Sequence, residues 1–110
     1  MLKPRVWALL VALSALVGCS EPSPDAPAEE LYSYYCLRCH GADGRGTPEH
    51  LELNPKNDLS LSEMVEARNR PEIHERIEDG YGPMPALVGK VESRVLDKLT
   101  DYTLELLPAH

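Results

Sequence analysis

Large aromatic side chains are almost absent from this chain, which limits the core that it can build. The sequence has 110 residues, with no Phe, one Trp and five Tyr, and this length fits one small domain. Such a domain buries a modest share of its surface, and aromatic rings supply the largest apolar areas per residue. Either the chain folds poorly, therefore, or a group that is not protein fills its centre.

The charge excludes nucleic acid as a partner. The chain has 18 acidic side chains against 11 basic ones, a net charge of -7. Loss of the leader described below would remove Lys3 and Arg5 and leave nine basic side chains. Nucleic-acid binding depends on basic side chains that neutralise phosphates. The acidic side chains either keep the domain soluble or steer it toward a protein partner with a basic docking patch.

The N-terminus has the order of a secretion signal. Lys3 and Arg5 precede residues 6–17, an apolar run in which Ser14 is the one polar residue. A bilayer span needs about 20 apolar residues, so the run is too short to be one. We interpret residues 1–18 as a signal peptide. The alternative is a buried N-terminal helix.

The run Leu-Val-Gly-Cys that ends at Cys19 resembles the lipobox of bacterial lipoproteins. The resemblance implies cleavage before Cys19 and lipid on its sulfur, and stable anchoring takes two or more acyl chains. A plain signal peptide followed by an unmodified Cys is the alternative. Residues 19–27 would then be the lipidated Cys and a Pro-rich, acidic tether, stiff and extended. Residues 28–110 would be the folded domain, exported and facing the periplasm, while the choice between inner and outer membrane stays open.

The clearest functional motif in the sequence is the segment Cys36-Leu37-Arg38-Cys39-His40. C-x-x-C-H is the attachment motif of c-type haem. Two thiols three residues apart on a helical turn can reach the two vinyl groups on one edge of the porphyrin and form thioethers. The adjacent His40 then turns a ring nitrogen toward the iron. We predict one covalent haem c on Cys36 and Cys39, with His40 as an axial ligand.

Three other interpretations of the cysteine pair compete. A thioredoxin-type site belongs in a βαβ setting, and the sequence has no alternating β-branched run. A zinc site needs two more ligands, and neither His50 nor His74 has a ligand pair beside it. A structural disulfide leaves His40 without a role.

Two segments resemble small class I bacterial cytochromes c that hold a single haem. Residues 32–46 are similar to the family's first helix, haem site and Gly-rich loop, and residues 77–87 to its distal loop. The resemblance covers about residues 28–107. It implies an all-α fold in which about four short helices surround the haem, and a one-electron carrier rather than an enzyme.

The sixth iron ligand is expected to be Met84. Pro83 and Pro85 flank it, and each disfavours helix in the residue before it, so the Met84 sulfur is free to project toward a metal. Met64 lies in a helical stretch and is expected in the core. His74 lies one position away from an apolar stripe and is expected at the surface.

Apolar spacing predicts helices over residues 28–38, 61–69, 71–80 and 91–107. Pro71 suits a first helical position and Gly80 a C-terminal cap. Residues 60–63 have the form of a capping box. We find no strand signal.

The family resemblance implies two contacts near the cofactor. Its first and last helices cross near the haem edge, which would pair the side bearing Tyr34 and Tyr35 with Leu99 and Tyr102. The family often orients the axial histidine through a proline carbonyl, and both Pro48 and Pro55 are candidates.

Two axial ligands leave the iron no open position, so one-electron transfer between Fe(III) and Fe(II) is the expected function. A Met sulfur raises the potential relative to two imidazoles. The first hypothesis is a lipid-anchored carrier between redox proteins outside the cytoplasmic membrane. The alternatives are a haem-relay subunit of a larger oxidoreductase and a haem module that binds a small ligand in place of Met84.

Overall fold

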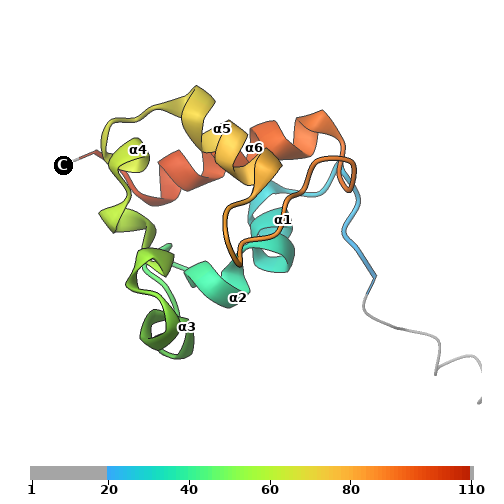
Figure 1. The fold of residues 1–110 in the computed structure, drawn as a ribbon. Helices are drawn as coiled ribbons and strands as arrows, with labels where there is room; N and C mark the ends of the chain where they lie inside the picture. Colours follow the sequence, from blue (N-terminus) through green and yellow to red (C-terminus); the bar gives the residue numbers. More distant parts are fainter. Residues whose placement is uncertain (1–19, 110) are drawn as a thin grey trace, which may run out of the picture.

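Helices make up all the regular structure of residues 20–109, the part of the chain that the computed structural model describes (Figure 1). The signal peptide, Cys19 and His110 lie outside these residues. The elements are α1 (Ala28–Tyr35), α2 (Leu37–His40), α3 (Pro48–Leu53), the 3₁₀ helices η3 (Pro55–Asn57) and η4 (Leu59–Leu61), α4 (Glu63–Glu66), α5 (Arg70–Asp79) and α6 (Ser93–Leu106). No helix between residues 20 and 109 is long and apolar enough to cross a membrane.

The all-α prediction is confirmed, with differences in individual elements. The helix expected over residues 28–38 is divided at Cys36 into α1 and α2. The one expected over 61–69 is reduced to the single turn of α4. Helix α5 has Pro71 in its first turn and Gly80 as its C-cap, as the sequence predicts. Helix α3 and the two 3₁₀ helices, which follow the cysteine motif, were not expected.

The capping-box prediction is wrong. Helix α4 begins at Glu63 after Ser62, whose side chain makes no capping hydrogen bond. Ser60 lies inside η4, where its backbone N–H donates to Asp58 Oδ1 at 2.9 Å. Asp58 therefore caps a 3₁₀ turn that the pattern did not reveal, and this turn occupies the position predicted for the helix start.

The core lies where α6 packs against both α1 and α5. Figure 1 shows α6 extending behind α5 across the top of the molecule, with α1 beneath it. Thr100 and Thr103 are buried on α6 and return their hydroxyls to the carbonyls of Leu96 and Leu99. This satisfies their hydrogen-bonding groups within the helix. The buried apolar residues are Leu31, Tyr32, Val65, Ile73, Ile77, Leu87, Val95, Leu96, Leu99 and Leu107.

Tyr32, rather than the side bearing Tyr34, makes the aromatic contact with α6. The rings of Tyr32 and Tyr102 lie 5.0 Å apart between centroids, and Tyr32 is 1% exposed. Tyr34 is 49% exposed and packs edge-on against Tyr35, which is half-buried. The prediction for Tyr34 is therefore wrong. Tyr34 lies two residues, about 200° of helix rotation, from Tyr32, so the two rings cannot face α6 together.

Candidate functional site

The cysteine motif forms one helical turn. The backbone N–H of His40 donates to the Cys36 carbonyl at 3.0 Å, and that of Gly41 to the Leu37 carbonyl at 2.8 Å. Cys36, Cys39 and His40 are half-buried, and both thiols are free. The structure thus brings these three residues together on a short helix, in the arrangement that the C-x-x-C-H spacing predicts.

The Cys36 thiol lies in a desolvated environment. Burial raises the pKa of Cys36 to about 12, and the neighbouring Cys39 acts in the same direction. Reactive cysteines of thioredoxin-type sites have the opposite property, a lowered pKa that favours the thiolate. The environment of Cys36 therefore gives no support to a redox thiol.

His40 is oriented by a backbone carbonyl. Its Nδ1 lies 2.9 Å from the carbonyl oxygen of Asn57, and a carbonyl can only accept, so Nδ1 donates. The neutral ring then carries its lone pair on Nε2, the nitrogen that can bind a metal. Such an outer hydrogen bond fixes the tautomer and the ring plane of metal-binding histidines.

The expectation that Pro48 or Pro55 supplies this carbonyl is wrong. The carbonyl belongs to Asn57 at the end of η3, two residues after Pro55. Pro55 begins η3, and its own carbonyl accepts from the Asp58 N–H at 3.1 Å. Asn57 also donates from its side-chain amide to the His50 carbonyl at 2.9 Å, which ties η3 to α3. Asn57 was missed because a backbone acceptor has no side-chain signature.

Tyr32 holds the loop that follows His40. Its buried hydroxyl donates to the Gly41 carbonyl at 2.7 Å, and burial raises the pKa of Tyr32, so the phenol stays protonated. Gly46 N–H donates to the His40 carbonyl at 2.7 Å. At Gly41, where φ is +75°, a Cβ atom would lie 2.9 Å from the Gly46 oxygen. The close return of this loop requires glycine there, and the Gly46 hydrogen bond joins the loop to His40.

Met84 lies in a tight turn attached to the end of α5. Two backbone hydrogen bonds join Met84 to Tyr81, at 3.0 and 3.1 Å. Farther along the loop, the N–H groups of Leu87 and Val88 both donate to the Glu78 carbonyl, at 3.1 and 3.0 Å. The Met84 side chain is half-buried and packs against the core. It therefore has the non-helical, positioned backbone that its flanking prolines predict.

The two histidines that could compete as ligands have other polar partners. Met64 packs against the core, as expected. His74 is 25% exposed, and its Nε2 lies 3.2 Å from Asp97 on α6. His50 Nδ1 lies 2.8 Å from the Thr47 hydroxyl. Across residues 20–109, no three His, Cys, Asp or Glu side chains gather as a metal-ion site, so the zinc interpretation gains no support.

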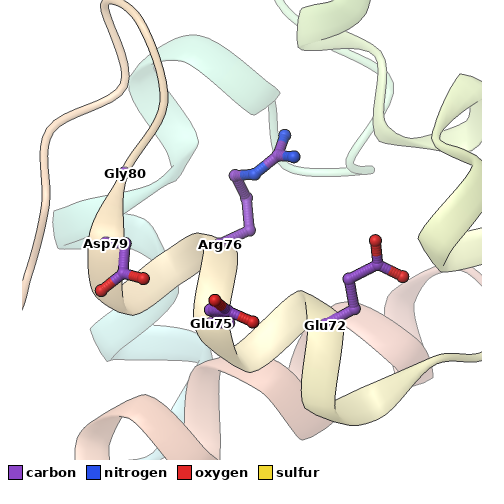
Figure 2. A pocket seen from close by; sticks show the side chains of 5 residues that line it. All are labelled: Glu72, Glu75, Arg76, Asp79 and Gly80. Atoms are coloured by element: carbon purple, nitrogen blue, oxygen red, sulfur yellow. The ribbon is translucent and has the colours of Figure 1, made fainter.

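A hollow of about 280 Å³ lies along α5 and ends at Gly80, its C-cap. Its lining residues are Glu72, Glu75, Arg76, Asp79 and Gly80, and Figure 2 shows Arg76 extending away from Glu75 and Asp79. The Arg76 guanidinium carbon lies 4.4 Å from the centre of the Tyr81 ring, a cation–π distance. Because Tyr81 is paired with Met84, this contact braces the turn. The four predicted haem-binding residues do not line the hollow.

Gly80→Ala should destabilise the domain strongly, because Gly80 joins α5 to the Met84 turn without room for a side chain. Its φ of 73° and ψ of -177° lie in a region that is essentially restricted to glycine. Any other residue held in this conformation is strained by about 1–3 kcal/mol. A Cβ atom would also lie 2.5 Å from the Met84 oxygen and 2.8 Å from the Ala86 nitrogen. We expect a loss of about 3 kcal/mol or more in the free energy of unfolding, measured by denaturant titration.

Gly82→Ala is the matched control. Gly82 has a φ of +56°, but a Cβ atom there would meet nothing within 4 Å. The left-handed backbone alone costs about 1–2 kcal/mol. An equal loss in both variants would show that the close contact at Gly80 contributes nothing.

The family comparison agrees with these features. Residues 23–102 match the model of a protein family described as cytochrome C oxidase, cbb3-type, subunit III. No curated protein and no solved structure matches the chain. The match covers more than half of the chain and includes both the cysteine motif and the Met84 turn. The chain therefore belongs to the cytochrome C oxidase, cbb3-type, subunit III family, and its helical domain is a cytochrome c domain whose family implies haem-based electron transfer.

Proposed function

We propose that this chain is a membrane-anchored c-type cytochrome with one haem, which carries single electrons between redox partners outside the cytoplasmic membrane. The observation that carries the proposal is the hydrogen bond from His40 Nδ1 to the Asn57 carbonyl. It leaves the Nε2 lone pair available for a metal, on the residue next to Cys39, and both thiols of the motif are free. These donors fit a covalent haem c, since two thiols and one neutral imidazole are what that group requires.

The residues then have separate roles. Cys36 and Cys39 would hold the haem through thioethers, and His40 and Met84 would be its axial ligands. When bound, haem supplies one-electron chemistry between Fe(III) and Fe(II). Asn57 and Tyr32 keep the His40 side in place, while Gly80 and Tyr81 keep the Met84 side in place. A positioned Met sulfur favours the reduced state, and fixed surroundings limit the rearrangement that accompanies each electron.

Protein redox partners are expected, and no small-molecule substrate. Without the leader, 18 acidic side chains face nine basic ones. This excess favours a partner with a basic docking patch, at a rate that falls as salt screens the attraction. A second candidate function is a haem-relay subunit of a larger oxidoreductase. The family description favours it, because that description names a subunit of an oxidase.

An absorbance spectrum of the full-length protein in isolated membranes tests the function. We expect a low-spin spectrum, reversible one-electron reduction and, in the oxidised state, the weak near-infrared band of methionine ligation. A high-spin spectrum, or ready binding of carbon monoxide by the reduced protein, would instead identify a module that binds small ligands. Co-purification with a catalytic protein after mild detergent extraction would favour the relay subunit.

The anchor is proposed from the sequence alone. Cys19→Ser should release haem-bearing protein from the membrane, because no sulfur remains to carry lipid and stable anchoring takes two or more acyl chains. The measurement is haem staining of membrane and soluble fractions. Ser20→Ala is a suitable control, since it leaves Cys19 intact. Retention of the Cys19→Ser protein in the membrane fraction would refute the lipid anchor.

A further inference from the structure

The segment before α1 is docked on the domain. We call residues 22–26 the strap. The Lys98 ammonium on α6 donates to the carbonyls of Pro24 and Ala26, at 2.9 and 3.0 Å. One helical turn earlier, the Arg94 guanidinium pairs with the Asp25 carboxylate. Two cations of α6 therefore hold the strap, although its composition predicts a free tether.

Packing and local turns support the same placement. Ala26 is half-buried against the core, and its N–H donates to the Ser23 carbonyl at 2.9 Å. Pro22 and Pro24 border a hollow of about 190 Å³. Because prolines restrict the undocked chain, docking costs less conformational entropy than it would for a flexible segment. The family match itself begins at residue 23, inside the strap.

The strap passes close to the haem-attachment turn. Tyr35, the last residue of α1, lines the same hollow as Pro22 and Pro24, and Cys36 follows it in the sequence. Figure 1 shows the strap, in blue, descending beside the first turns of α6. The chain thus leaves the domain at the side that carries the end of α1.

We propose that the strap is a latch that holds the cytochrome domain near its membrane anchor, so that it exchanges electrons with a redox protein at the same membrane surface. The inference rests on the proposed function, because it takes Cys19 as the anchor. Only Ser20 and Glu21 separate Cys19 from the strap, a span of at most about 11 Å. With the strap undocked, the span from Cys19 to Ala28 could reach about 32 Å. The latch therefore restricts the domain to roughly a third of the reach of a free tether.

Hydrogen exchange on the full-length, haem-loaded protein tests the docking. Lys98→Met keeps the apolar stem of the side chain and removes the donor. We expect the Ala26 amide to exchange at least about tenfold faster in this variant. A tenfold change corresponds to about 1.4 kcal/mol, which is near the low end for a hydrogen bond to a charged group. Lys90→Met is the control, because Lys90 lines the same hollow without a hydrogen bond or ion pair to the strap within the described chain. If the wild-type amide exchanges as fast as that of an unstructured peptide, the latch is wrong.

Energy transfer tests the reach. The lipidated, haem-loaded protein is placed in vesicles of phosphatidylethanolamine and phosphatidylglycerol that contain a headgroup dye, which haem quenches at short range. We expect quenching to weaken in Lys98→Met and to stay at the wild-type level in Lys90→Met. Equal quenching in Lys98→Met despite faster exchange would overturn the restriction of reach. Failure of the wild-type protein to bind vesicles would overturn the anchor, a result separate from the exchange data.

Discussion

Replacing both Cys36 and Cys39 with Ser should give a chain that carries no covalent haem and does not fold cooperatively. Serine cannot form the thioethers, and His40 and Met84 would then hold the cofactor only through reversible coordination bonds. The measurement is haem staining after denaturing electrophoresis, combined with circular dichroism during thermal unfolding. Cys19→Ser is the control, since it also removes a cysteine but leaves the attachment motif intact and should keep its stain.

The expected loss of folding follows from the composition of the core. Ten apolar residues are buried between residues 20 and 109, and Tyr32 is the one aromatic among them. Domains of this size are marginal without a staple or a cofactor, and both thiols that could form a staple are free. A haem-free double variant that unfolds cooperatively, with the melting temperature of the parent, would show that the protein core suffices.

The parts of the fold that the sequence predicts are those with a local cause. Helix α5 follows from Pro71, two isoleucines one turn apart and Gly80, all of which act within ten residues. The arrangement of Cys36, Cys39 and His40 also follows from local spacing, because one helical turn brings them together. In both cases the helical period alone determines which side chains lie on the same face, without any contact to residues far away in the sequence.

The parts that the sequence does not predict depend on distant or backbone groups. Asn57 orients His40 with a main-chain oxygen 17 residues away, which any residue type could supply. The strap has the composition of a free tether, yet its docking depends on Lys98, 74 residues beyond Pro24. Tyr34 was placed on the wrong side of α1 because three tyrosines within four residues leave the inward face ambiguous.

Met84→Ala should abolish the near-infrared band of the oxidised protein and lower its reduction potential. Alanine has no sulfur, and loss of the thioether removes the ligand that favours the reduced iron. Because Tyr81 and Glu78 hold the turn through backbone hydrogen bonds, the substitution should leave the loop in place and open one coordination position. The measurements are the oxidised spectrum, a redox titration and carbon monoxide binding, which the variant should gain.

Two control variants distinguish Met84 from its rivals. Met64→Leu conserves volume at a half-buried core position and should keep the band, with a small cost in stability. His74→Gln removes one partner of Asp97, which also pairs with Arg70, and should also keep the band. Loss of the band in Met64→Leu, together with its survival in Met84→Ala, would identify Met64 on α4 as the ligand. Both methionine side chains are half-buried and pack against the core, so burial does not choose between them. Met84 is the proposed ligand because it lies in a turn outside any helix, and the band in these variants tests that choice.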